Sequence, residues 1–110
     1  VQHAGVEALE NTDEAVEEMV AAFEKRRDYL VDLFERRGVD VVEPEGAFYL
    51  MLPLPTEDDH AWCEAAIEDA HVAMVPGSPF GTPGYARISY ANSLERLEEA
   101  VERLDEADLL

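Results

Sequence analysis

Arg87 is the residue in this 110-residue sequence whose type and setting best suit a chemical role. It lies in the strand-like segment 85–90, directly after a glycine- and proline-rich stretch at residues 76–84. Strand alternation places Arg87 on one face with Tyr85 and Ser89. An arginine there can present its planar guanidinium to a carboxylate in a bidentate pair. The same pattern also fits an exposed strand arginine paired with one of many nearby acids, and spacing alone leaves both open.

Two further segments contain residue types that bind ligands. The stretch 76–84 has three glycines and three prolines, which is typical of a shaped loop that backbone and ligand can approach closely. It lacks the spacing of a phosphate-binding loop. His60, Cys63 and Glu64 can share a helix face as part of a metal site, but Trp62 and Ile67 indicate a packing helix, so we expect no metal. No catalytic residue is predicted.

Two helices are expected before the Arg87 segment. Residues 1–9 indicate the tail of a helix that begins before Val1. A long helix then begins at an Asn11 cap, with Glu14 completing a capping box, and ends near Gly38. Its apolar stripe comprises Val16, Met19, Val20, Phe23, Leu30, Leu33 and Phe34, interrupted by Arg26 and Arg27. A helix of this length suggests that it spans something larger than one small domain.

The rest of the chain alternates strands and helices. Strands are predicted at residues 39–42, 47–52, 72–75 and 85–90, and the apolar run 47–52 indicates burial on both faces. A helix over 56–70 would be capped by Thr56, and a final amphipathic helix would open at Asn92. Acids Glu57, Asp58 and Asp59 would lie in the first turn of the 56–70 helix. These elements predict one α/β (α+β) domain: a small, mostly antiparallel sheet packed with helices and preceded by a long spanning helix.

Charge and composition exclude several classes of partner. Twenty-six acidic residues and eight basic ones give a net charge of −18, which disfavours nucleic acid and anionic lipid as partners. Lys25 is the only lysine, and such acidic, lysine-poor surfaces suit a salt-adapted (halophilic) source. No segment reaches the ~20 apolar residues of a membrane span. The single cysteine fits a reducing compartment, so we expect a cytoplasmic location.

Four segments resemble motifs of one enzyme family, in the same order and over essentially the whole chain. They are residues 24–30 (EKRRDYL), 44–49 (PEGAFY), 75–81 (VPGSPFG) and 86–91 (ARISYA). They are similar to the E-x-R-R-D-x-L, P-x-G-A-F-Y, V-P-G-x-x-F-G and R-I/L-S-x-A patterns of fold-type I, class I/II aminotransferases. The chain therefore resembles the C-terminal small domain of an aspartate aminotransferase-like enzyme that depends on pyridoxal 5'-phosphate (PLP).

The resemblance implies roles for two residues. Arg87 would bind the α-carboxylate of the amino acid and 2-oxo acid substrates, and Phe48 would lie near the substrate. It also implies a homodimer, and a small domain that moves to close the active site.

The resemblance places the cofactor elsewhere. PLP and its Schiff-base lysine would belong to an upstream domain, because nothing here matches the S-x-S-K motif and Lys25 does not correspond to that lysine. Residues 1–10 would be the tail of a helix from that domain. The 110 residues would need the rest of their own chain and would be inactive alone.

Two alternatives to an enzyme part remain open at this point. One is a stand-alone module that holds a small carboxylic acid through Arg87 without turnover. The other is a dimerisation module that uses the apolar stripe of the long helix. The identity of the amino acid substrate is also left open by the sequence.

Overall fold

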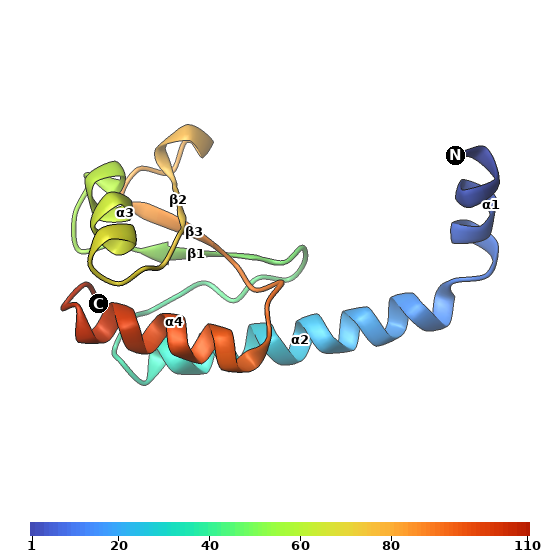
Figure 1. The fold of residues 1–110 in the computed structure, drawn as a ribbon, viewed down its shortest axis with the longest axis horizontal. Helices are drawn as coiled ribbons and strands as arrows, with labels where there is room; N and C mark the ends of the chain where they lie inside the picture. Colours follow the sequence, from blue (N-terminus) through green and yellow to red (C-terminus); the bar gives the residue numbers. More distant parts are fainter.

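Four α-helices, three short strands and one 3-10 turn make up the computed structural model, which describes residues 1–110 (Figure 1). In chain order they are α1 (Gln2–Glu10), α2 (Asp13–Glu35), β1 (Tyr49–Pro53), α3 (Asp59–Glu68), β2 (Val75–Pro76), η1 (Ser78–Phe80), β3 (Tyr85–Ser89) and α4 (Leu94–Glu106). The predicted α+β class with a small antiparallel sheet is confirmed. None of the helices is both long and apolar enough to cross a bilayer.

The sheet has the order β1-β3-β2, and both pairings are antiparallel. Arg87 lies in the middle strand, opposite Met51 of β1 and Val75 of β2. Leu50 and Leu52 are buried on one face of β1, whereas its other face is partly open to solvent. The prediction that residues 47–52 are buried on both faces is therefore wrong, because no layer of this domain covers the face that carries Arg87.

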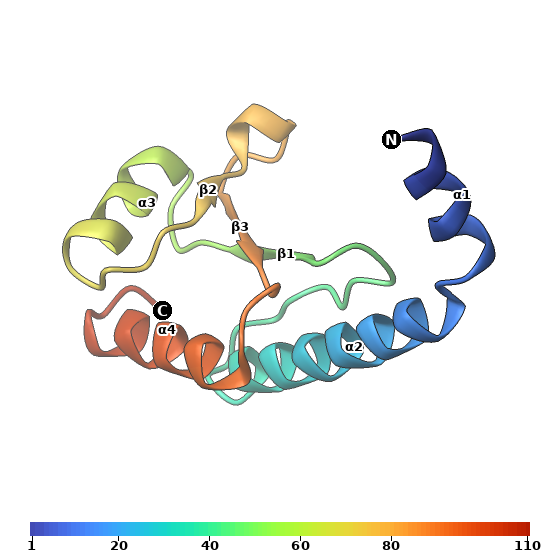
Figure 2. The ribbon, with the colours of Figure 1, turned by 45° about the vertical axis from the view of Figure 1, so that its right-hand side comes forward.

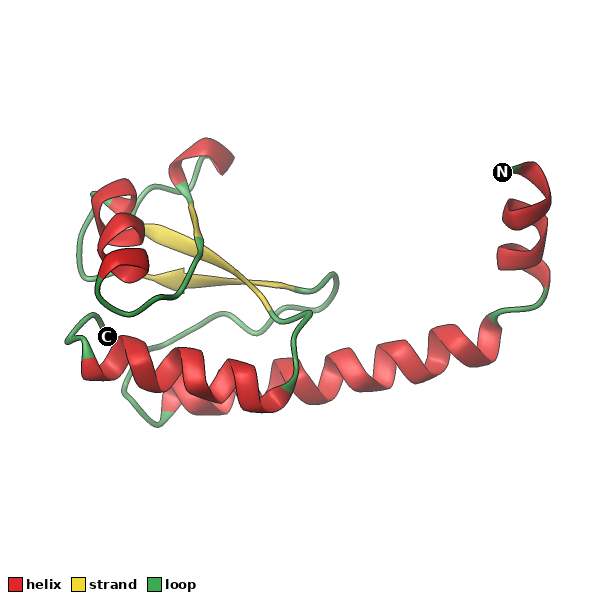
Figure 3. Cartoon of the chain, viewed as in Figure 1, coloured by secondary structure: helices red, strands yellow, loops and turns green.

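The hydrophobic core is built from residues of both the strands and the helices, and α2 and α4 lie on one side of the strands (Figure 3). The C-terminal half of α2 and the whole of α4 run side by side beneath the sheet, and α3 lies beside β2 and β3 (Figure 2). Their shared core includes Leu30, Phe34, Trp62, Ala66, Leu97, Val101 and Leu104, all of which are buried. Helix α4 buries a regular stripe because its apolar residues recur at the spacing of one helical face.

Helix α1 and the N-terminal half of α2 extend away from this core (Figure 1). Helix α1 has no buried residue, and α2 buries residues only from Leu30 onward. The exposed apolar side chains on this arm are Val6, Leu9, Val16, Met19 and Val20. The long helix predicted from the sequence is thus present, but the domain itself covers only its last turns.

Two strand predictions need correction. Residues 39–42 form no strand: Val41 is buried, whereas Val42 is 83% exposed and has no partner strand. The predicted strand 72–75 shrinks to Val75–Pro76. The valines at 39, 41 and 42 indicate a tendency to pack against apolar residues, but they do not by themselves make a strand. A strand also needs a neighbouring strand for its backbone hydrogen bonds.

Strand β1 is shifted relative to its predicted range of 47–52. It begins at Tyr49 because Ala47 has a left-handed backbone (φ 60°) that ends the preceding turn. It continues through Pro53, which lies opposite Tyr85. Proline is tolerated there because β1 is an edge strand whose outer N–H groups need no partner.

The helix N-caps also differ from prediction by one or two residues. Thr12 rather than Asn11 precedes α2, Asp58 rather than Thr56 caps α3, and Ser93 rather than Asn92 caps α4. Helix α2 ends at Glu35, and Gly38 then takes the expected left-handed conformation (φ 77°). Adjacent cap-forming residues compete for each helix start, so sequence spacing alone does not choose among them.

Candidate functional site

The Arg87 side chain lies between two aromatic rings. The guanidinium carbon is 4.3 Å from the centroid of the Tyr49 ring and 4.3 Å from that of the Phe80 ring. Tyr49 comes from β1 and Phe80 from η1, so three separate segments meet at this side chain. Stacking on rings holds a guanidinium by its flat faces and leaves the N–H groups at its edge available to an acceptor.

Arg87 makes no ion pair, although the chain contains twenty-six acids. Five of the seven arginines do pair with a carboxylate: Arg27, Arg36, Arg37, Arg96 and Arg103. The alternative that Arg87 is an exposed strand arginine paired with a nearby acid is therefore wrong. Instead, a charged and unpaired guanidinium lies over two rings on the open face of the sheet, where its N–H groups can donate to an external carboxylate.

Phe48 joins the same aromatic cluster. Its ring is 4.4 Å from that of Tyr49 and stacks on Phe23 of α2, with centroids 5.8 Å apart. The side chain is 38% exposed. Phe48 and Arg87 thus both contact the Tyr49 ring. The two residues predicted from the sequence to belong to the site are therefore linked through Tyr49, which was not predicted.

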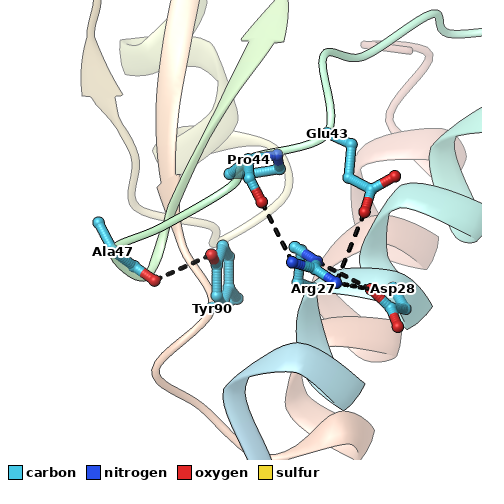
Figure 4. A network of polar contacts seen from close by, with 6 residues as sticks. All are labelled: Arg27, Asp28, Glu43, Pro44, Ala47 and Tyr90. Atoms are coloured by element: carbon cyan, nitrogen blue, oxygen red, sulfur yellow. Dashed lines mark hydrogen bonds and ion pairs between the residues drawn. The ribbon is translucent and has the colours of Figure 1, made fainter. Parts of the chain in front are cut away.

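The turn before Phe48 is tied to α2 by Arg27 (Figure 4). Arg27 donates to the Pro44 carbonyl (3.3 Å) and forms ion pairs with Asp28 (2.7 Å) and Glu43 (3.5 Å). The hydrogen bond with Asp28 raises the pKa of Arg27. The second arginine of the E-x-R-R-D-x-L segment therefore fixes the chain on its way to β1.

Tyr90 secures the same turn from the sheet side (Figure 4). Its hydroxyl donates to the Ala47 carbonyl (3.1 Å), and its N–H donates to the Phe48 carbonyl (2.9 Å). Tyr90 is 2% exposed, and this burial raises the pKa of its phenol. The rings of Phe48 and Tyr49 consequently project from a segment held at both ends.

The loop that carries Phe80 is attached to α3 by Asp59. This carboxylate is 1% exposed and accepts hydrogen bonds at Oδ2 from the Ser78 N–H (2.8 Å) and hydroxyl (2.7 Å). Burial acts to raise the pKa of Asp59. The hydrogen bonds from Ser78 and Gly84 and the charge of His60 outweigh that effect and hold the pKa below its ordinary value.

The remaining polar residues of α3 do not extend the site. Cys63 is 3% exposed within the core, where burial raises the pKa of its thiol. His60 and Glu64 lie exposed on the same helix. No three or more His, Cys, Asp or Glu side chains are grouped so that they could hold a metal ion.

Sequence reasoning missed Tyr49, Phe80 and Asp59. The register offered one signal: Tyr49 lies opposite Ser89, which shares the face of Arg87. Phe80 could have been chosen as the one aromatic residue of the loop. Asp59 gave no signal, because its neighbours Glu57 and Asp58 are exposed acids of the same type.

Known proteins resemble this chain over nearly its full length. Residues 1–104 match the model of the family Aminotransferase class I and II. The chain is 44% identical over 105 residues to an aspartate aminotransferase of Thermotoga maritima, covering 96% of this chain and 27% of that protein. It is 45% identical over 114 residues to a probable aspartate/prephenate aminotransferase of Aquifex aeolicus, covering 96% of this chain and 29% of that protein.

Solved structures agree with the sequence relatives. An aspartate aminotransferase of Thermus thermophilus, solved with maleate, superposes with a TM-score of 0.85 at 38% identity, covering 94% of this chain and 28% of that one. An aromatic aminotransferase of Pyrococcus horikoshii gives 0.81 at 38% identity, covering 92% and 29%. The chain thus spans less than a third of the length of these relatives. It belongs to the class I and II aminotransferase family.

Proposed function

We propose that these residues bind the α-carboxylate of amino acid and 2-oxo acid substrates in a PLP-dependent aminotransferase, with Arg87 as the carboxylate-binding residue. The observation that supports this most directly is the unpaired guanidinium held between Tyr49 and Phe80. A carboxylate that meets its free edge can form two parallel charge-assisted hydrogen bonds. The α-carboxylate is the group that amino acids and 2-oxo acids share, so one arginine serves both halves of an amino-group transfer.

Phe48 is proposed to lie beside the bound substrate. It is partly exposed and lies against Tyr49, one ring away from Arg87. An apolar side chain there would exclude water from the carboxylate pair, and removing water strengthens such an interaction. Its role would be to shape the site rather than to take part in proton transfer.

The residues present do not fit a PLP site. The only lysine, Lys25, is exposed on α2. It forms no ion pair with any carboxylate of the chain. We propose that other residues of a longer chain hold PLP, which supplies the chemistry of amino-group transfer. These 110 residues would then be inactive alone.

The exposed arm supports a partner within the same protein. Val16, Met19 and Val20 are each about half exposed on α2, beside an α1 that buries nothing. Apolar surface of this kind is usually covered in the assembled molecule. We propose that residues 1–110 are a C-terminal small domain, that 1–10 belong with the large domain, and that the enzyme is a cytoplasmic homodimer.

The test uses the complete natural polypeptide with Arg87→Leu and Arg87→Lys. Losing a bidentate pair costs about 2–4 kcal/mol, so Arg87→Leu should lower kcat/KM for the best of aspartate, phenylalanine and alanine by about 30- to 1000-fold. Arg87→Lys keeps the charge but not the planar fork, so its loss should be smaller. The inhibition constant for maleate should rise in parallel.

Two comparisons keep this test specific. Arg36→Leu removes an equivalent charge from an exposed ion pair on α2 and should leave kcat/KM unchanged. The amine that corresponds to the amino acid substrate without its α-carboxylate should react equally slowly with the wild-type and Arg87→Leu proteins. An unchanged kcat/KM for the amino acid in Arg87→Leu would refute the proposed role.

A carboxylate-binding module without turnover is the second candidate, supported by the same unpaired guanidinium. The intact mass of the polypeptide in its source cells separates the two. A species several times heavier than 12.3 kDa supports the enzyme. A species at that mass that binds maleate through Arg87 supports the module.

A further inference from the structure

We propose that Asp59 is a positioning residue of the Arg87 site: its buried carboxylate holds the loop that keeps Phe80 stacked on the guanidinium. The inference rests on the proposed function of Arg87. It concerns a residue on α3 that touches neither Arg87 nor a substrate and that acts through Ser78.

Asp59 is the only charged or polar residue among the eighteen buried residues of the chain. No cation pairs with it. Placing a lone carboxylate in the interior is unfavourable unless hydrogen bonds replace the lost water. The Ser78 N–H and hydroxyl both donate to Asp59 Oδ2, so the burial of Asp59 depends on keeping this loop in place.

The loop transmits that position to Phe80. Ser78 and Phe80 belong to the same 3-10 turn, which is closed by hydrogen bonds from the Phe80 and Thr82 N–H groups to the Gly77 carbonyl (2.8 and 3.1 Å). Gly77 in turn donates to the Tyr85 carbonyl of β3 (2.7 Å). A turn this short and this fully hydrogen-bonded moves as one unit, so releasing Ser78 also releases the Phe80 ring.

The position of the Phe80 ring affects the guanidinium directly. Tyr49 covers one side of Arg87 from a strand, whereas Phe80 covers it from a loop with no strand partner of its own. Phe80 is itself 51% exposed, so burial contributes little to holding it. The Asp59–Ser78 contact is therefore the side-chain link between this turn and α3, in addition to the backbone hydrogen bond from Gly77 to Tyr85 of β3.

Two variants of the complete polypeptide test the link. Asp59→Asn removes the charge at nearly constant shape, and Ser78→Ala removes the hydroxyl donor while leaving the Ser78 backbone N–H. Glu57→Gln is the matched control, because it makes the same change of charge two residues away on an exposed side chain.

Asp59→Asn should raise KM for the best amino acid and the inhibition constant for maleate by about tenfold, since a misplaced binding group can lose that much. Ser78→Ala should show a smaller rise, and the double variant should lose no more than Asp59→Asn alone. Hydrogen exchange of the amides of residues 77–82 should accelerate in both variants, while α4 remains protected. Glu57→Gln should match wild type throughout.

A residue that merely stabilises the fold would behave differently. It would lower kcat for the amino acid and for its decarboxylated amine alike, whereas a positioning residue alters only the carboxylate-bearing ligands. Unchanged maleate affinity in folded Asp59→Asn and Ser78→Ala would overturn the inference. If Arg87→Leu also leaves the maleate affinity unchanged, the proposed function of Arg87 is wrong. If Arg87→Leu weakens maleate binding but Asp59→Asn and Ser78→Ala do not, only the positioning role of Asp59 is wrong.

Discussion

At the scale of single residues, the site depends on a charge that is left without a partner. In a chain with three acids for each base, an arginine would ordinarily meet a carboxylate, and most of the others do. Arg87 differs because its guanidinium carbon lies over two aromatic rings, each 4.3 Å away, and no carboxylate is within ion-pair distance. The rings attract the cation without using its N–H groups. In the proposed function, the free energy of a carboxylate pair is thereby available to an external ligand.

Asp59 predicts a specific dependence of stability on pH. Its pKa is lower in the folded chain than in the unfolded one, so the unfolded state binds more protons as the pH falls. Its contribution is complete above the unfolded pKa of about 4 and is lost as the pH falls through the lower folded value. Asp59→Asn lacks this contribution, so the Tm difference between wild type and variant should shrink between about pH 6 and pH 3.

The quantity that tests this prediction is the difference in Tm between the wild type and Asp59→Asn at each pH. Glu95 also has a lowered pKa, owing first to hydrogen bonding with its own N–H, so wild-type stability alone would fall in acid for more than one reason. Glu57→Gln is the control for loss of one exposed carboxylate on the same segment. A Tm difference for Asp59→Asn that stays constant down to pH 3 would show that the carboxylate does not titrate as argued.

At the scale of elements, the loop before β3 allows no side chain at Gly77. A Cβ added there would lie 2.2 Å from the Thr82 carbonyl and 2.8 Å from that of Tyr85. Both obstacles are backbone, so the turn itself would have to shift. Gly77→Ala should lower stability by about 1–3 kcal/mol, a typical cost of overpacking. It should also weaken maleate binding, because Phe80 moves with the turn.

A second glycine provides the control for that change. Gly5 lies inside α1 with nothing within 4 Å of an added Cβ and without a left-handed backbone. Gly5→Ala should leave maleate binding intact, because α1 makes no contact with the Arg87 site. If the maleate affinity of Gly77→Ala matched that of Gly5→Ala, the proposed coupling between the turn and Arg87 would be wrong.

The helices and strands also show how much of the fold could be predicted from the sequence. Helices α2 and α4 and strand β3 were predicted well because periodic apolar residues report directly on one buried face. The strand predicted at 39–42 failed because valines pack equally well in a loop that crosses the core. Tyr49 and Phe80 escaped notice because their closeness to Arg87 depends on the pairing of β1 with β3 and on a 3-10 turn. Neither the strand pairing nor the 3-10 turn can be predicted from the spacing of nearby residues.

At the scale of the whole molecule, two properties come from surface that this domain leaves open. The arm of α1 and α2 gives a molecule with extents of 48 × 28 × 23 Å, in which much apolar surface on the arm is uncovered. The surface is also strongly acidic, with a net charge of −18. The apolar arm favours association with further protein, whereas the charge opposes compactness and association alike.

Salt should therefore raise stability. The dependence of Tm on salt concentration distinguishes charge screening from stronger burial of apolar surface as the cause. Screening shortens the Debye length from about 10 Å at 0.1 M to about 3 Å at 1 M, so relief of self-repulsion is largely complete by about 1 M. We expect Tm to rise steeply with KCl over that interval and then to level off. A rise that began only above about 2 M would instead indicate stronger burial of apolar surface.

A charge variant separates these causes within one protein. Glu17 and Glu18 on α2 and Glu64 on α3 are exposed and make no ion pair, so changing all three to Gln reduces the magnitude of the net charge without breaking a contact. If repulsion limits stability, the triple variant should have a higher Tm at 0.1 M KCl and a flatter slope up to 1 M. An identical slope in the two proteins would contradict a screening origin. The salt response would then belong to the uncovered apolar arm, whose burial strong salt favours whatever the charge.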